Sequence, residues 1–182
     1  TALQNVAYTM YSRDLSQKIK SVYLAKQKRG EYFTAYGMYG YVKNPNNPKQ
    51  LIIDPEAAAV VRRIFEMRKQ KYTYRQISMA LTNDGILTPS RYKAKRGIEN
   101  KTWSRTGGYD RWCVATLRQI IADERYTGKM VGRKTVNSIV GSKKPKLVPP
   151  EKRIVVENTH EPIISQELFD AVQTQKKRKP FK

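Results

Sequence analysis

The chain has 182 residues, of which 36 are Lys or Arg and 15 are Asp or Glu, so its formal charge is +21 at pH 7. Hydrophobic residues make up 39% of it, enough for a modest core, and no apolar run approaches the roughly 18 residues of a membrane span. One cysteine, Cys113, and one histidine, His160, exclude an internal disulfide and a zinc site with four Cys or His ligands. So large a positive charge indicates an anionic partner, with nucleic acid as the first candidate.

The N-terminal part is predicted to contain a loop, a helix and a hairpin. Residues 1–11 show no clear period and are interpreted as a loop, whereas the apolar stripe of residues 15–23 predicts a helix that ends at Gly30. Aromatics and glycines dominate residues 32–42, which favours extended backbone with tight bends. The turn residues of 44–48 separate residues 39–42 from the short strand 51–53, so a hairpin is expected.

Two short helices are predicted next. Asp54 and Pro55 are a strong helix start, and residues 60–65 carry the buried stripe of that helix. Thr73 and Gln76 form a capping box that opens a second helix, which Gly85 ends. The four-residue link between them is compatible with a helix-turn-helix-like cluster. Residues 88–110 are interpreted as a long basic loop.

A third helix is predicted over residues 111–123, with an inner and an outer face. Val114, Leu117, Ile120 and Ile121 are expected to face inward. The opposite stripe is formed by Ala115, Arg118, Gln119 and Ala122. Small residues beside Arg and Gln suit an approach to base edges, because Arg pairs with guanine and Gln with adenine. A plain solvent face fits this stripe equally well.

The C-terminal part is predicted to be a small β element followed by a helix. Residues 128–135 and 153–157 are interpreted as strands, with a basic loop over 141–146 between them. Ser165 caps a final helix, and the basic run 176–180 resembles a linker. The expected fold class is therefore α+β: a long N-terminal helix, a short hairpin, a helical cluster, a small C-terminal β element and a final helix.

Several stretches occur in the order found in a known family. These stretches are Tyr11–Ile19, Gly37–Tyr41, Leu51–Ala57, Val61–Phe65, Ile77–Pro89, Trp112–Gly128 and His160–Val172. Together they resemble the large serine recombinases of phages and mobile elements, and they are most similar to those of conjugative transposons. Two positions depart from the family pattern. Met38 replaces a common proline in a turn, and Cys113 replaces a usual serine cap, so the helix is expected to begin at Asp110 instead.

The resemblance implies a domain plan and a role. Residues 1–30 would end the linker helix of a catalytic domain, residues 31–175 would be the recombinase DNA-binding domain, and residues 176–182 would start a linker to a zinc ribbon. The catalytic serine domain would lie before Thr1 and the zinc ribbon after the chain. This part would thus be no enzyme itself and would need no cofactor or metal. It would bind attachment-site duplex DNA for integration or excision of a mobile element, in the bacterial cytoplasm, within a protein that self-associates.

The DNA contacts expected from the resemblance and from residue chemistry fall into three groups. Residues 30–40 would follow the minor groove, helped by flanking cations, and the helix 111–122 would enter the major groove, with Arg118 and Gln119 reading bases. The remaining cations would hold phosphates. The full set is Lys26, Lys28, Arg29, Tyr36, Arg91, Lys93, Lys95, Arg96, Arg105, Arg111, Ala115, Arg118, Gln119, Arg133 and Lys134.

Alternative functions come from other classes. The residue types of phosphoryl transfer are present in Ser12, Ser16 and Ser21 near Arg13. Serines on a helix surface, however, usually have no catalytic role. The sequence Gly37-Met38-Tyr39-Gly40 is a G-x-x-G loop of the kind that KH domains place on RNA, although it lacks the flanking KH helices. A basic scaffold or membrane-surface protein is a third possibility. Cys113 is interpreted as a partly buried packing residue and His160 as a turn or strand-end residue, without chemical roles.

Overall fold

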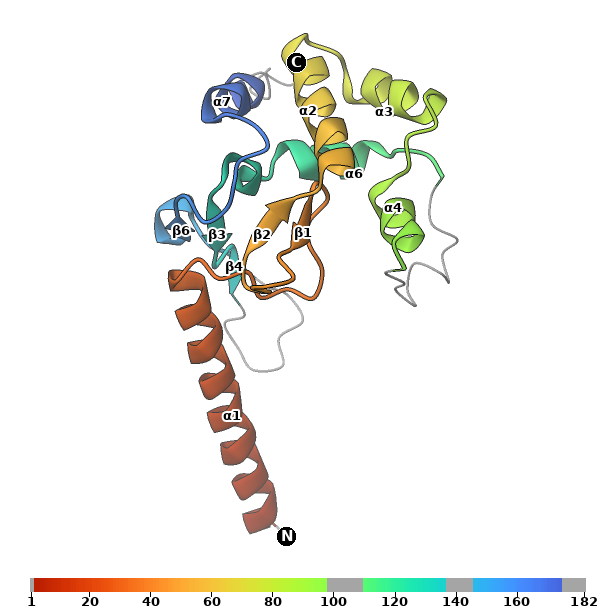
Figure 1. The fold of residues 1–182 in the computed structure, drawn as a ribbon. Helices are drawn as coiled ribbons and strands as arrows, with labels where there is room; N and C mark the ends of the chain where they lie inside the picture. The colour runs from red at the N-terminus through yellow and green to blue at the C-terminus, as the bar shows by residue number, and fades with distance from the viewer. Residues whose placement is uncertain (1, 98–109, 137–145, 175–182) are drawn as a thin grey trace, which may run out of the picture. The chain divides into compact units, whose positions relative to one another are not determined.

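A computed structural model describes residues 2–97, 110–136 and 146–174 (Figure 1). The chain divides into two compact units, each assembled from separate segments. The first, here called the helix–sheet unit, comprises Thr1–Tyr36, Lys43–Ile52 and Gly128–Glu161. The second, the helical unit, comprises Gly37–Val42, Ile53–Thr127 and Pro162–Lys182. The predicted α+β class is confirmed, because the expected long N-terminal helix, hairpin, helical cluster, small C-terminal sheets and final helix are all present.

The helix–sheet unit consists of a long helix and short strand pairs. Helix α1 spans Ala2–Lys28 and contacts strands β3 (Met130–Gly132) and β6 (Ile154–Val156), which pair antiparallel. Strands β4 (Thr135–Val136) and β5 (Lys146–Leu147) form a second antiparallel pair, and the 3-10 helix η2 (Pro150–Lys152) precedes β6. The strands expected over 128–135 and 153–157 are confirmed as shorter segments.

The expected loop at residues 1–11 is wrong, because α1 already includes residues 2–11. The sequence does carry a helical spacing there, in Leu3, Val6, Ala7 and Met10, although Val6 and Met10 are exposed in the structure. Neither Gly nor Pro interrupts residues 2–28, and the helix therefore continues until Gly30.

Gly30 ends α1 in the manner predicted. Its φ is +67°, its N–H donates to the Gln27 carbonyl, and the Glu31 N–H donates to the Lys26 carbonyl, which together form a Schellman motif. A Cβ at Gly30 would lie 2.5 Å from the Thr159 methyl carbon, so only glycine fits there.

The predicted hairpin is present as strands β1 (Tyr41–Lys43) and β2 (Leu51–Ile53), which pair in a two-stranded sheet. The turn between them is closed by backbone bonds from Asn47 to the Asn44 carbonyl and from Gln50 to the Asn47 carbonyl. The Asn44 and Asn47 side chains add bonds to nearby backbone N–H groups, as turn-forming Asn residues do.

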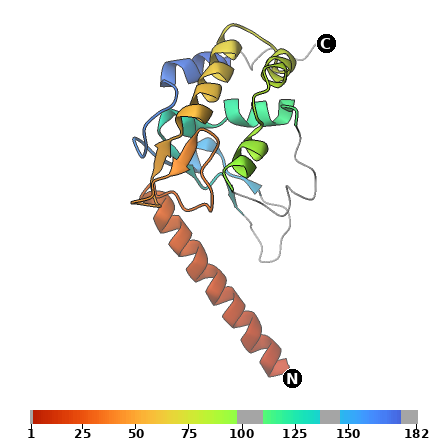
Figure 2. The ribbon, with the colours of Figure 1, turned by 45° about the vertical axis from the view of Figure 1, so that its right-hand side comes forward.

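The helical unit is built around helix α2 (Pro55–Lys69), which packs against α3 (Tyr74–Asn83), α6 (Val114–Ile121) and α7 (Gln166–Thr174), as Figures 1 and 2 show. Two shorter elements, α4 (Pro89–Lys95) and η1 (Glu124–Thr127), complete its described part. The largest fully buried side chains of the protein all lie in this unit: Val61, Ile64, Phe65, Ile77, Leu81, Leu117, Ile121 and Val172.

The local helix signals agree with the structure. Thr73 and Gln76 form the predicted capping box, with Gln76 N–H to Thr73 Oγ1 at 3.2 Å and Thr73 N–H to Gln76 Oε1 at 2.8 Å. Gly85 has a φ of +67° and ends α3 as predicted. Ser165 caps the last helix, since its Oγ accepts the Leu168 N–H at 3.2 Å.

Three expectations for residues 88–123 are wrong. Part of the presumed loop is helix α4, which starts at Pro89 after the N-cap Thr88, a start signal that the long basic stretch obscured. The next helix begins at Val114 rather than at Asp110 or Arg111, and Cys113 is its N-cap. Its Sγ accepts the Thr116 N–H at 3.4 Å, so the thiol performs the role of the usual serine; Cys113 is exposed instead of being a packing residue.

Candidate nucleic-acid interface

Helix α6 presents the two faces that its sequence period predicts. Leu117, Ile120 and Ile121 are buried against the helical unit. On the opposite side Ala115, Arg118, Gln119 and Ala122 are all exposed. A helix with small residues around one Arg and one Gln on an open face has the shape and the donors to reach base edges in a major groove.

Arg118 is held by an aromatic partner that the sequence did not reveal. Its guanidinium carbon lies 5.5 Å from the ring centroid of Tyr74, the first residue of α3. The guanidinium carbon of Arg68 lies 4.7 Å from the same ring, and Arg68 Nη1 also donates to the Tyr72 carbonyl at 2.8 Å. Tyr74 thus gathers two cations, and its ring restricts the positions that Arg118 samples.

A pocket of about 280 Å³ lies between α4 and α6. We call it the α4–α6 pocket. Three residues predicted to contact DNA, Lys93, Arg111 and Gln119, meet there, although up to 26 positions separate them in sequence. Its other lining residues are Thr88, Pro89, Ser90, Trp112, Cys113 and Thr116.

Hydrogen bonds hold the α6 side of this pocket in place through Trp112, which is only 2% exposed. Its indole Nε1 donates to the Ile86 carbonyl at 2.8 Å, and its backbone N–H donates to Thr82 Oγ1 at 3.2 Å. The Ser78 hydroxyl donates to its carbonyl. Because all of the main-chain and side-chain polar groups of Trp112 are bonded to the α3 region, its neighbours Arg111 and Cys113 have a well-defined backbone position.

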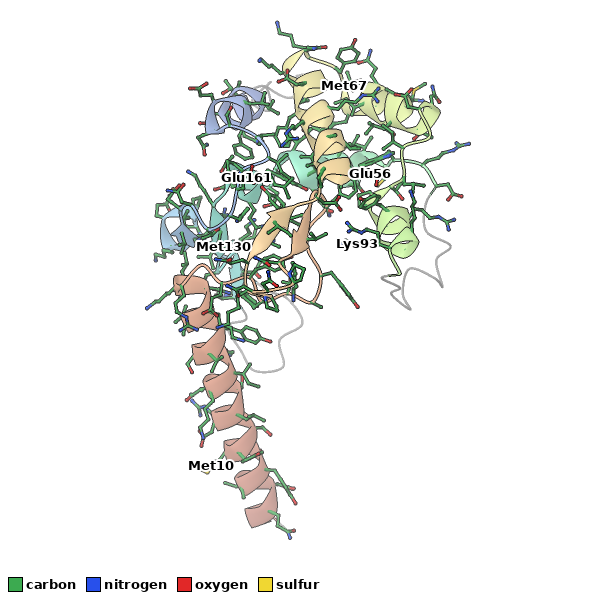
Figure 3. All side chains as sticks on the ribbon, in the orientation of Figure 1. Met10, Glu56, Met67, Lys93, Met130 and Glu161 are labelled. Atoms are coloured by element: carbon green, nitrogen blue, oxygen red, sulfur yellow. The ribbon has the colours of Figure 1, made fainter. Side chains whose placement is uncertain are left out.

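The α4 side of the pocket is held through a buried carboxylate. The Tyr92 hydroxyl lies 3.0 Å from both carboxylate oxygens of Asp54, and Arg96 forms an ion pair with the same group. Asp54 is the N-cap of α2 as predicted, but its side chain makes no capping bond; it binds α4 instead. In Figure 3 the labelled residues Lys93 and Glu56 mark helices α4 and α2.

These surroundings change the pKa of two side chains near the pocket. Burial is the cause that lowers the pKa of the Lys93 ammonium. For the Cys113 thiol, the hydrogen bond from Thr116 Oγ1, with the sulfur and hydroxyl oxygen 3.0 Å apart, is the main cause that lowers the pKa. Backbone N–H groups at the start of α6 act in the same direction.

The other predicted contact residues lie in varied environments. Arg29 pairs with Glu31 at 2.7 Å and Arg91 with Asp110 at 2.8 Å, both on the surface. Arg96 neutralises Asp54, so part of its charge serves the fold. Lys28, Tyr36, Lys95, Arg111 and Arg133 are exposed, Lys26 and Lys134 are half-buried, and Arg105 lies outside the described residues.

These residues belong to two separate groups. Lys26, Lys28, Arg29, Tyr36, Arg133 and Lys134 are in the helix–sheet unit. Arg91, Lys93, Lys95, Arg96, Arg111, Ala115, Arg118 and Gln119 are in the helical unit. Sequence reasoning missed Tyr74, Ser90 and Thr116 as neighbours of this second group. The capping box before Tyr74 marked a helix start, but no local signal indicates a cation over its ring.

The G-x-x-G sequence is not placed as a nucleic-acid loop. Tyr39 is 7% exposed and packs edge-on against Tyr92 and Trp112, at ring distances of 5.8 and 5.7 Å. Gly40 is buried, and a Cβ there would lie 2.8 Å from Ile163 Cδ1. A loop that clamps an RNA backbone must be open to it, so the KH-type interpretation does not fit.

Neither a metal site nor a membrane span is found in residues 2–97, 110–136 and 146–174. No group of three or more His, Cys, Asp or Glu side chains there is arranged to hold a metal ion. No helix among those residues combines the length and the apolar character needed to cross a membrane.

Comparison with known proteins identifies the family of this chain. A family profile described as Recombinase matches residues 55–179. The uncharacterized protein YefB of Bacillus subtilis (strain 168) is 33% identical over 102 residues, which cover 54% of this chain and 31% of that protein. The chain thus spans about a third of the length of that relative.

Two solved structures share the fold. One is described as "Crystal Structure of a LSR-DNA Complex", with a TM-score of 0.50, 19% identity and coverage of 85% of this chain and 38% of that one. The other, described as "Sequence Requirements of the Listeria innocua prophage attP site", has a TM-score of 0.50, 18% identity and coverage of 89% and 50%. Since the family profile spans more than half of the sequence, the chain belongs to the Recombinase family of large serine recombinases, as its ordered motifs predicted.

Proposed function

We propose that this chain binds duplex DNA sequence-specifically at recombination attachment sites, as the central DNA-binding domain of a large serine site-specific recombinase. The observation that carries the proposal is the open face of α6, where Arg118 and Gln119 stand exposed between two alanines. Membership of the Recombinase family and the +21 charge support it.

In this proposal the two classes of contact have different tasks. Arg118 and Gln119 read bases in the major groove, with Ala115 allowing close approach. Arg91, Lys93, Lys95, Arg96, Arg105, Arg111, Arg133 and Lys134 hold phosphates and fix the register of the domain without specifying sequence. Lys26, Lys28, Arg29 and Tyr36 accompany the exposed residues 33–36 after α1 along the minor groove.

The chain contributes binding, and strand cleavage belongs to another part of the recombinase. Ser12, Ser16 and Ser21 all lie on the single helix α1, and Ser21 Oγ donates to the Lys18 carbonyl within it. We assign residues 1–30 to the linker helix, 31–175 to the DNA-binding domain and 176–182 to the following linker. The whole protein acts on attachment sites as a self-associating assembly.

Selection from a random duplex library, followed by footprinting of the recovered sequence, tests the proposal. We expect a protected half-site of about one to two helical turns. If about 6–10 phosphates are neutralised, log K falls with log salt at a slope near −5 to −9. A flat salt response, or recovery of no shared sequence, would refute sequence-specific binding.

The base-reading role of Arg118 has its own control. Arg118→Ala is expected to weaken binding by about 1–3 kcal/mol and to relax the preference at one base position. Arg75→Ala removes the same charge from the exposed surface of α3 and should leave every base preference unchanged. If Arg118→Ala weakened binding to all DNA sequences equally, Arg118 would be a phosphate contact instead of a base contact. Competition with single-stranded RNA separates the RNA-binding alternative from duplex binding.

A further inference from the structure

We propose that the α4–α6 pocket is a socket for one phosphate group and that, when the chain holds DNA, a single backbone phosphate of the duplex occupies it. The identification of the occupant as a DNA phosphate rests on the proposed function. The socket itself rests on the lining residues, which also suit a free phosphate ion, and the experiment below separates these two sources.

The charges of the pocket select an anion. Lys93 reaches it from α4 and Arg111 from the segment before α6, and no carboxylate is among its described lining residues. Asp110, the acidic neighbour of Arg111, is directed to Arg91 at 2.8 Å. Two cations facing one cavity repel each other, and burial already lowers the pKa of Lys93, so a negative charge between them relieves both penalties.

The neutral groups of the pocket select an oxyanion with several acceptors. The Ser90 hydroxyl lines it together with the two cations and can donate to such a ligand. The Thr116 hydroxyl, which bonds the Cys113 sulfur, and the Gln119 amide, assigned above to base edges, border the pocket. A phosphate offers acceptor oxygens in several directions, and a guanidinium with an ammonium is a pairing that proteins use to bind it. The volume of about 280 Å³ accommodates a phosphodiester group but is below the range of pockets for larger ligands.

The socket is formed before the ligand arrives. Trp112 is bonded at its indole, its N–H and its carbonyl, and α4 is tied to α2 through Tyr92 and Asp54. Little conformational entropy is therefore lost when an anion enters, which favours binding of a small group. The exposed residues Ala115 and Arg118 lie on the same turns of α6 as the lining residues Cys113, Thr116 and Gln119, so a phosphate seated here would fix the depth and register of that helix.

Cys113 offers a direct readout because it is the only cysteine in the chain and it lines the pocket. Hydrogen bonds lower the pKa of its thiol, which raises the fraction of reactive thiolate at a given pH. Iodoacetamide is an uncharged probe and is not drawn to the cations. We expect saturating selected duplex to slow alkylation of Cys113 at least tenfold. If the duplex is bound and Cys113 still reacts at the rate of the free protein, the socket is overturned while the proposed function stands.

Inorganic phosphate distinguishes the two sources of the ligand. Phosphate that slows alkylation at millimolar concentration, compared with chloride at equal ionic strength, supports the socket even if no duplex is bound. In that case the ligand is a free ion and the proposed function fails alone. If neither phosphate nor duplex protects Cys113, the socket is overturned.

A double-mutant cycle tests the charge contact itself. The partners are Lys93→Gln and a selected duplex in which one linkage at a time is an uncharged methylphosphonate. For one linkage we expect about a tenfold loss of affinity with the unmodified protein and less than a twofold loss with Lys93→Gln. Lys69→Gln, an equal charge change at the exposed end of α2 and outside the pocket, should retain the tenfold loss.

The cycle overturns the backbone-phosphate assignment if every linkage has the same effect in the unmodified protein and in Lys93→Gln. Arg111→Gln should give the same linkage as Lys93→Gln, because both cations face one cavity. Different linkages for the two variants would place them on separate phosphates and refute a shared socket. Unchanged thermal unfolding of both variants shows that the losses arise from binding.

Discussion

Removal of the Tyr92 hydroxyl should destabilise the protein because it leaves a buried carboxylate with fewer partners. Asp54 is 6% exposed, and its two carboxylate oxygens each lie 3.0 Å from the Tyr92 hydroxyl. A hydroxyl has one proton to donate, and Glu56 Oε2 lies 3.3 Å from the same hydroxyl, so the three distances describe one charge-assisted bond that Asp54, the nearer acceptor, shares with Glu56. The loss of such a bond costs about 1.5–3 kcal/mol. Tyr92→Phe retains the ring that packs against Tyr39, so packing is preserved.

The expected cost is measurable by urea and thermal unfolding. At about 2–4 °C per kcal/mol for a chain of this length, Tyr92→Phe should lower the Tm by about 3–12 °C. Tyr72→Phe removes the same atom from a residue that is 43% exposed and should change the stability by less than about 0.5 kcal/mol.

A second background shows whether the charge of these carboxylates is the cause. Asp54→Asn combined with Glu56→Gln replaces both nearby carboxylates by amides, whose bonds with Tyr92 are between neutral groups and worth about 0.5–1.5 kcal/mol. Tyr92→Phe should therefore cost less in this doubly substituted background than in the native one. An equal cost in both backgrounds, or a cost below about 0.5 kcal/mol in the native one, would refute the reasoning.

Three further predictions concern glycine, capping and alkaline pH. Gly40→Ala should cost at least about 2 kcal/mol more than Gly85→Ala by urea unfolding, because both have positive φ but only Gly40 would bring its Cβ within 2.8 Å of another side chain; equal losses would contradict this. Cys113→Ser should exceed Cys113→Ala in unfolding free energy by about 1 kcal/mol, since serine is the better N-cap, and the idea fails if their order is reversed. Burial and the bond to Asp54 raise the pKa of Tyr92 to about 12 from about 10 in the unfolded chain, so its stabilisation is complete below pH 10 and is lost as the pH rises towards 12. Urea unfolding across this pH range should show that Tyr92→Phe flattens the decline, and an unchanged slope would contradict it.

The exposed apolar residues of α1 mark a limit of pattern analysis. The stripe of Leu15, Ile19 and Val22 predicted a helix correctly, yet these side chains remain 45–53% exposed. A period of 3.6 residues states that one face is apolar but not what covers it. Leu3, Val6, Ala7 and Met10 extend a helical spacing into the first turns of α1, which were wrongly predicted as a loop.

Local signals were sufficient for much of the helical unit. Caps and glycine stops act over three to five residues, so Thr73, Gly85 and Ser165 could be assigned from the sequence alone. The inner and outer faces of α6 likewise follow from spacing, because burial of Leu117 and its neighbours forces Arg118 and Gln119 outward. Ordered motifs also identified the family, since each motif is read within a short window.

The arrangement of the site depended on tertiary contacts. Asp54 satisfied every rule for a capping residue, but its carboxylate binds a tyrosine and an arginine that follow it by 38 and 42 positions. Tyr74 gained two cations, and Lys93, Arg111 and Cys113 gained one cavity, only because α3, α4 and α6 pack together. Sequence by itself determined helices α2, α3, α6 and α7 and the faces that they bury, because those effects are local. Only the folded structure decided which charges meet, because a side chain's partner is set by packing between segments that are distant along the chain.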